Sequence, residues 1–328
     1  MKSPTVLAPE VQGRSQKPAL TRSALAEFAD LAARLDSAAT WNATVARFGE
    51  YLPEGFGFDP WAEIAARIER CVADARPASF IRLGDGEGNL LALALNEYPA
   101  LAAHCARAGA LLHFGGADVL LRAAPEVLPA FQTALRNSHL IGFPGPFGPR
   151  MMLNRPAAET QVRPIHGLVS VHRYLTRFAD DLELRLKTGA PAGFHRGLLP
   201  HYQALISGRA TGIVTCHAQL ADALRVRMGA STVDLRLVPR QAVIAMDPSA
   251  DTGHWPGRFR DLMRELQTIE PGTLWFVAAG MLGKVYCEAI RAAGGIAVDI
   301  GHTADVWAGV RSRAYLQPDF LATWRIAY

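Results

Sequence analysis

The sequence has few lysines, few cysteines and no long apolar run. Only four of its 34 basic residues are lysines, so arginine supplies nearly all of the positive charge. Arginine suits bidentate phosphate binding, although a genome-wide composition bias predicts the same excess. The basic residues form no run with interleaved aromatics, which argues against a nucleic-acid-binding surface. We therefore expect no nucleic-acid partner.

The four cysteines are dispersed along the chain and fit no metal-binding spacing. They are Cys71, Cys105, Cys216 and Cys287. Without a CxxC pair or a Cys/His spacing typical of zinc sites, the pattern favours reduced, mostly buried thiols in a cytoplasmic protein. No stretch approaches the roughly 20 apolar residues of a membrane span. The net charge of +4 leaves peripheral association with the inner membrane face open.

Composition and periodicity divide the 328 residues into three parts. Residues 1–21 mix proline, basic residues and serine, which predicts a disordered tail. Residues 22–76 predict a helical N-terminal extension, with a helix from Ser23 to Leu35. Residues 77–328 predict one α/β domain, in which 144–202 form a less regular insertion or flank.

Short apolar runs alternate with helical patterns after residue 78. The predicted strands are Phe80–Leu83, His139–Phe143, Gly212–Thr215, Val233–Val238, Leu274–Ala278 and Ile296–Ile300, and the predicted helices are 90–95, 172–186, 218–228 and 281–293. This alternation predicts a Rossmann-like, mainly parallel sheet flanked by helices. Ligands of such sheets bind beyond the carboxyl ends of the strands. No GxGxxG opens the first helix, which argues against a dinucleotide-dependent oxidoreductase.

The first candidate site is the glycine-rich turn 84–88, directly after the first predicted strand. Its glycines let the backbone turn sharply and approach a ligand closely. Asp85 and Glu87 stand two residues apart and can converge on one point. Two carboxylates suit Mg²⁺ or Mn²⁺ holding a diphosphate. An Asp-Gly pair is also common in ordinary turns, and Glu87 could be a first-turn residue stabilised by the helix dipole.

The second candidate block, residues 273–307, contains two further predicted strands. The first is followed by Gly280 and then by Lys284, early in a helix whose N-terminus suits a phosphate group. The second strand ends near His302, with Asp305 three residues further on. If the strands are parallel, both ends lie at the sheet edge that carries the first turn.

Most of these residues also have an ordinary structural interpretation. Lys284 is typical of a solvated helix position, and Asp305 of a helix N-cap. His302 could be a core histidine, and Arg82 an ion-pair partner. His113 and His217 could line the cleft or be purely structural. Arg311 and Arg313 could meet a donor or acceptor phosphate or form a solvated basic face.

The two blocks resemble the GT-D glycosyltransferase fold family of bacterial sugar transferases. Arg82-Leu-Gly-Asp-Gly-Glu87 resembles that family's Arg-x-Gly-Asp-Gly-Glu segment, whose carboxylates bind a metal and the donor diphosphate. The strand end Asp299-Ile-Gly-His302 resembles the family's closing block. The sequence departs from the family at 216–218, where Cys-His-Ala replaces the usual polar turn, and residues 1–75 have no counterpart.

The resemblance implies a GT-D type fold and a metal-dependent transfer of a hexose. The donor would be a nucleoside diphosphate sugar, a UDP-sugar in this family, and the acceptor a hydroxyl of a glycan or a lipid-linked glycan in polysaccharide or glycoconjugate synthesis. Asp85 and Glu87 would hold Mn²⁺ or Mg²⁺, with His302 or Asp305 as the base. The residues expected to bind the donor are Arg82, Gly84, Gly86, Gly280, Lys284 and Arg311.

Two other functions use the same residues. A metal-dependent phosphate-ester hydrolase or nucleotidyl transferase would employ the same carboxylates, with water or another nucleophile in place of the sugar acceptor. A non-catalytic member of the fold would bind a glycan or a protein partner without turnover.

Overall fold

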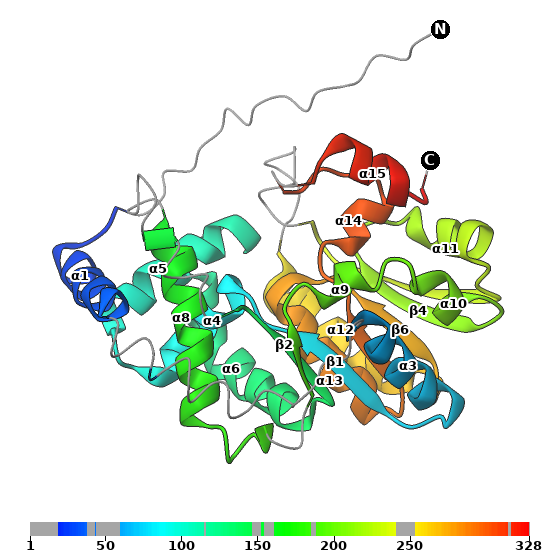
Figure 1. Ribbon diagram of the computed structural model, residues 1–328, viewed down its shortest axis with the longest axis horizontal. Coiled ribbons are helices and arrows are strands. Elements are labelled where there is room, and N and C mark those ends of the chain that lie inside the picture. Colours follow the sequence, from blue (N-terminus) through cyan, green and yellow to red (C-terminus); the bar gives the residue numbers. More distant parts are fainter. Residues whose placement is uncertain are drawn as a thin grey trace, which may run out of the picture.

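A computed structural model shows one sheet between layers of helices (Figure 1). The structure describes residues 19–37, 43, 60–114, 116–145, 152–153, 161–184, 188–240, 253–313 and 316–327. Most of the predicted tail 1–21 lies outside these residues. The predicted N-terminal extension contains α1 (Arg22–Asp36), which coincides with the predicted helix, and α3 (Pro60–Ala73).

The strands that the structure describes form one parallel sheet. They are β1 (Ala78–Arg82), β2 (Leu140–Phe143), β3 (Thr188–Pro191), β4 (Ala210–Thr215), β5 (Thr232–Leu237), β6 (Leu274–Val277) and β7 (Ile296–Asp299), in the order β3-β2-β1-β7-β6-β4-β5. Every neighbouring pair is parallel. The predicted Rossmann-like sheet is therefore confirmed, and β3 is a strand that the sequence did not predict.

The order of the strands brings the two candidate blocks together. In the sheet, β2 and β3 lie on one side of β1. On the other side of β1 lie β7 and β6, which separate it from the pair β4 and β5. Phe80 of β1 pairs with Val298 of β7, and Val277 at the end of β6 pairs with Asp299. Because all these strands point the same way, the residues that follow β1, β4, β6 and β7 meet at one edge.

Helices cover both faces of the sheet. Their bounds are α4 (Asp85–Leu95), α5 (Pro99–Phe114), α6 (Val119–Asn137), α8 (Val162–Arg177), α9 (Phe194–Gly197), α10 (Tyr202–Ile206), α11 (Leu220–Met228), α12 (Phe259–Glu265), α13 (Gly283–Ala292), α14 (Thr303–Trp307) and α15 (Pro318–Trp324), with short π or 3₁₀ turns η3 (His254–Arg258), η4 (Leu266–Thr268) and η5 (Gly280–Leu282). None of the helices among the described residues is long and apolar enough to cross a membrane.

Side chains along the strands point alternately to the two faces of the sheet, and each face packs against its own hydrophobic core. Ile81 and Trp275 pack with α4, α6, α12 and α13, whereas Phe80 and Phe276 pack on the other face with α3, α10, α11 and α14. Successive strand residues point to opposite faces, so the continuous apolar runs reflect a sheet that is buried on both sides. A third cluster joins α1, α5 and α8, at the left of Figure 1.

The segment 144–202 supplies regular structure as well as irregular chain. It contributes α8, α9, α10 and the edge strand β3, and parts of it (146–151, 154–160 and 185–187) lie outside the described residues. The helix expected at 172–186 is displaced, because α8 begins at Val162 and ends at Arg177. Pro164 falls in the first turn of α8, where proline is tolerated.

Two glycines allow α4 and α8 to cross in close contact. A Cβ placed on Gly88 would stand 1.8 Å from the Gly167 carbonyl oxygen, and one placed on Gly167 would stand 2.1 Å from the Asp85 carbonyl oxygen. Asn89 reinforces the crossing, because its side-chain amide donates to the carbonyl oxygens of Asp85 (2.7 Å) and Arg163 (3.1 Å). The first turn of α4, which carries the candidate carboxylates, is thus fixed by α8.

We predict that Gly167→Ala destabilises the protein by about 1–3 kcal/mol, because its Cβ meets backbone that cannot move without separating the helices. Gly109→Ala in α5 is the matched control, since its Cβ would meet nothing within 4 Å. The control should be neutral or stabilising by up to about 1 kcal/mol. Urea unfolding of both variants measures the difference, and equal stabilities would contradict the close crossing.

Candidate active site

A cavity of about 650 Å³ lies at the carboxyl edge of the sheet, where β1, β4, β6 and β7 end. The predicted site residues that line it are Arg82, Gly84, Asp85, Gly86, Glu87, Gly280, His302 and Asp305. His113 and His217, the two histidines for which the sequence allows a place in the cleft, line it as well, and so does Arg313. Two blocks that are some 200 residues apart in the chain therefore share one cavity.

Two predicted site residues, Lys284 and Arg311, do not line the cavity. Arg311 is exposed and is not among the lining residues. Lys284 is completely buried behind the cavity wall, so it is neither a solvated helix residue nor, in this arrangement, a direct ligand contact.

Lys284 holds two carboxylates from different parts of the chain. Its ammonium group donates to Glu87 Oε1 and lies 2.9 Å from Asp299 Oδ2, and it also donates to the Gly280 carbonyl oxygen at 3.2 Å. Arg82 Nε lies 3.4 Å from the other Asp299 oxygen. The second Glu87 oxygen accepts the Gly84 N–H at 2.9 Å, which closes the first turn of α4. One buried network thus joins the ends of β1 and β7 to the first turns of α4 and α13.

The charges in this network stabilise one another against burial. Burial raises the pKa of Glu87, but Lys284 and Arg82 outweigh that effect and lower the pKa to about 2. Burial likewise lowers the pKa of Lys284, but Asp299 and Glu87 more than offset it and raise the pKa above its usual value. Both partners are therefore charged at neutral pH.

We predict that Lys284→Met lowers the free energy of unfolding by about 3–5 kcal/mol, because it leaves two buried carboxylates without their shared cation. Arg264→Met is the control, since it removes an exposed i,i+3 ion pair with Asp261 and should change stability by less than about 1 kcal/mol. Chemical denaturation at pH 7 compares the two. A Lys284→Met protein as stable as the control would show that the network contributes nothing.

Asp85 differs from Glu87 in facing the solvent side of the site. It is the first residue of α4, its side chain is 37% exposed, and its Oδ2 lies 2.7 Å from Arg163 Nη1 of α8. Arg163 was not singled out from the sequence, because nothing in the pattern of α8 shows that it crosses the start of α4.

The two carboxylates fit a divalent cation unequally. Asp85 lines the cavity and engages Arg163 through one oxygen, so the geometry allows its other oxygen to bind an ion. Glu87 has both oxygens occupied, by the Gly84 N–H and by Lys284. Glu87 can join a metal only if Lys284 shifts toward Asp299, which it already contacts.

His302 is paired with a second histidine. Its Nε2 lies 3.2 Å from Nε2 of His195, whose Nδ1 donates to the Ala192 carbonyl oxygen at 3.2 Å. Since His195 carries its proton on Nδ1, its Nε2 accepts the proton of His302. Burial, then the charges of Arg82 and Arg313, lower the pKa of His302 to about 3, so this imidazole is neutral and weakly basic at pH 7.

Asp305 faces the residues that follow β4. Its Oδ1 lies 2.7 Å from His217 Nε2, and the Cys216 thiol stands beside them. Burial alone would lower the pKa of His217, but hydrogen bonds to Asp305 and Cys216 raise it to about 9. Without a bound metal, the cavity wall therefore carries a protonated imidazole next to a carboxylate at neutral pH.

Comparisons with known proteins give structural matches of low similarity. No protein-family model matches the chain, and no curated protein matches it. A selenomethionine-substituted structure of domain of unknown function 1792 is 14% identical, with a TM-score of 0.39, and the match covers 73% of this chain and 76% of that one. A second structure, described as "the highly conserved domain of unknown function 1792" with "a distinct glycosyltransferase fold", is 15% identical with the same coverage and TM-score.

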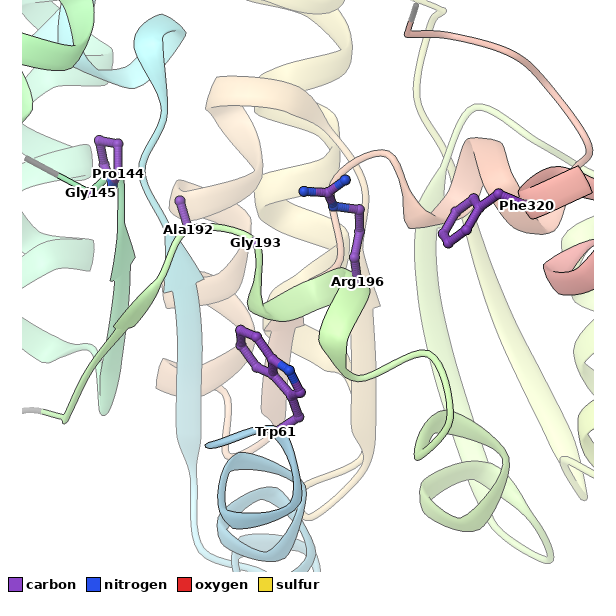
Figure 2. A pocket seen from close by; sticks show the side chains of 7 residues that line it. All are labelled: Trp61, Pro144, Gly145, Ala192, Gly193, Arg196 and Phe320. Carbon is purple, nitrogen blue, oxygen red and sulfur yellow. The ribbon is translucent and has the colours of Figure 1, made fainter. Parts of the chain in front are cut away.

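A second hollow of about 460 Å³ lies beside the carboxyl ends of β2 and β3. Figure 2 shows Trp61 of α3 on one side of it, Phe320 of α15 on another and Arg196 of α9 between them. Arg196 directly follows His195, whose Nε2 lies 3.2 Å from Nε2 of His302 in the main cavity. The hollow is therefore next to the wall of the main cavity.

Several residues of the site escaped the sequence analysis. Arg163, His195 and Asp299 contact predicted site residues and come from a helix, a short helix and the end of a strand. Only Asp299 had a usable signal, because it belongs to the Asp-Ile-Gly-His strand end. The other two are recognisable only once the fold is known.

Proposed function

We propose that this protein is a glycosyltransferase that moves a sugar from a nucleoside diphosphate sugar to a hydroxyl acceptor. The observation that carries the proposal is the single cavity in which Asp85, Arg82, His302 and Asp305 meet at the carboxyl edge of a parallel sheet. The two blocks that resemble the GT-D family both reach this cavity, which supports a UDP-sugar as the donor.

The positive groups around the cavity suit a departing diphosphate. Arg82 and Arg313 line it, and His217 adds a further positive charge at neutral pH. The first turn of α4 also presents N–H groups at the positive end of the helix dipole. Negative charge that develops on the leaving diphosphate would be stabilised by groups that are already in place.

A divalent cation would assist from Asp85. In this proposal Asp85 would hold Mn²⁺ or Mg²⁺ through the oxygen that does not contact Arg163, and the ion would supply Lewis-acid stabilisation of the leaving diphosphate. Glu87 joins it if Lys284 moves to Asp299; otherwise Glu87 orders the turn through the Gly84 N–H.

Asp305 is the better candidate for the base. A neutral His302 with a pKa near 3 is a poor proton acceptor at neutral pH. Asp305 is a carboxylate that lines the cavity and is held in place by His217. We therefore propose that Asp305 accepts the proton of the acceptor hydroxyl and that His302 orients a substrate.

We predict that UDP or a UDP-sugar raises the melting temperature of the wild-type protein more with Mn²⁺ than without it, and that Asp85→Asn removes the metal-dependent part. Asp118→Asn is the matched control, because this exposed aspartate lies outside the cavity and pairs with Arg107 at the surface. It should retain the full shift. Thermal-shift measurements with UDP, GDP and CMP and their sugars provide the readout.

The same protein then distinguishes the alternatives in a turnover assay. Release of UDP that needs a glycan acceptor supports the transferase. Release of product without acceptor would assign a hydrolase, and nucleotide binding without any turnover would assign a non-catalytic role. No shift with any nucleotide would overturn the proposed donor class.

We also propose that the second hollow binds the glycan acceptor. Trp61 and Phe320 offer aromatic faces to a sugar ring, and Arg196 offers a donor to its hydroxyl or acidic groups (Figure 2). Because Arg196 follows His195, which contacts His302 in the main cavity, such an acceptor would lie beside the donor cavity.

We predict that Phe320→Ala raises the acceptor KM by about 2–10-fold, the equivalent of about 0.5–1.5 kcal/mol for one aromatic contact. The donor-induced thermal shift should stay unchanged. Val226→Ala removes an exposed hydrophobic side chain of α11 away from both hollows and should leave both values as in wild type. A Phe320→Ala protein with wild-type acceptor KM would exclude this hollow as the acceptor site.

A further inference from the structure

The turn after β4 and the first helix after β7 bring three metal-ligating side chains together. Ligand atoms of Cys216, His217 and Asp305 all lie within 4.8 Å of one another. All three residues line the main cavity. Cys216 and His217 are adjacent in the chain, but Asp305 is distant from them, so the group cannot be recognised from the spacing of its residues in the sequence.

We propose that Cys216, His217 and Asp305 form a site for one transition-metal ion of the Zn²⁺ class, with a further coordination position open to the cavity. A thiol, an imidazole and a carboxylate are the ligand types that zinc takes, whereas Mg²⁺ and Mn²⁺ favour oxygen ligands alone. Three protein ligands and one open position is also the arrangement of catalytic rather than structural zinc sites.

The separations between the three ligand atoms fit a zinc ion after an adjustment of the side chains. Ligands of a tetrahedral zinc ion stand roughly 3.3–3.8 Å apart, given metal–ligand bonds of about 2.0–2.3 Å. The group must therefore contract by at most about 1.5 Å at its longest separation, while the 2.7 Å contact between His217 Nε2 and Asp305 Oδ1 opens by about 0.6 Å. Side-chain rotation at the partly exposed Cys216 can supply most of this change.

The second nitrogen of His217 gives independent support. The side chain is 1% exposed, and its Nδ1 has no hydrogen-bond partner among the described residues. A buried polar atom without a partner marks a place where a ligand or an ion is missing. Binding through Nε2 keeps His217 and Asp305 on the same ion as Cys216, and the unpartnered Nδ1 is then the place for the outer hydrogen bond that a metal-bound histidine usually donates.

The site is separate from the one proposed at Asp85. Asp85 begins the helix after β1, whereas Cys216 and His217 follow β4 and Asp305 lies in α14. If the proposed transferase function is correct, an ion here would replace the positive charge of His217 and would occupy Asp305, so the acceptor hydroxyl would lose its proton while bound to the ion, and Asp305 would act as the base only in the metal-free protein. The metal site itself does not depend on that function.

Cobalt titration of the full-length protein tests the proposal directly. After chelator treatment and under anaerobic conditions, Co²⁺ should bind at one ion per chain and produce a near-ultraviolet charge-transfer absorption from the thiolate, and Zn²⁺ should displace it stoichiometrically. Cys216→Ser should abolish this absorption, and His217→Ala should weaken binding at least tenfold.

Two control variants separate this site from others. Cys71→Ser changes a buried thiol that accepts a hydrogen bond from Arg76, as a hydroxyl also can, and should keep the absorption. Asp85→Asn should also keep it, so failure at one site leaves the other unaffected. If circular dichroism shows that Cys216→Ser does not fold, Asp305→Asn replaces it and should bind Co²⁺ more weakly. No thiolate absorption in wild type, or equal absorption in Cys216→Ser, would overturn the proposal.

Discussion

A single buried ammonium group organises the carboxyl edge of this sheet. Lys284 lies between Glu87 and Asp299, and Arg82 supports Asp299 from the far side. Charges of opposite sign in a dry environment hold one another firmly, but each is unfavourable without the others. The ends of β1 and β7 and the first turns of α4 and α13 therefore have to fold together.

This constraint decides which groups can meet a ligand. Because Glu87 is engaged by Lys284 and the Gly84 N–H, Asp85 is the carboxylate of this turn that faces the cavity with an oxygen available to a ligand. The close crossing of α4 and α8 then fixes the position of Asp85 and supplies Arg163. The opposite wall has a different chemistry, with a thiol, a histidine and a carboxylate after β4 and β7. One cavity thus offers a hard oxygen ligand on one side and softer ligands on the other.

The local sequence was sufficient to predict most strands of the sheet, but not to predict which residues contact the candidate site residues. The six predicted strands are apolar runs long enough to be recognised, and β3, with the sequence Thr-Gly-Ala-Pro, lacks the apolar residues that mark a strand. The sequence predicts Lys284 as a phosphate contact because a helix pattern cannot show that two carboxylates from elsewhere surround it. Cys216 and Asp305 are likewise neighbours only through the strand order β7-β6-β4. Contacts that depend on the strand order can be identified only from the structure.

A crystal structure of the protein with UDP and Mn²⁺ would test the central claim most directly. We expect the diphosphate in the main cavity, between the first turn of α4 and Arg82, with Mn²⁺ on Asp85 and with the Lys284–Asp299 contact intact. A nucleotide bound elsewhere, or a diphosphate that does not approach Asp85, would contradict this account of the site.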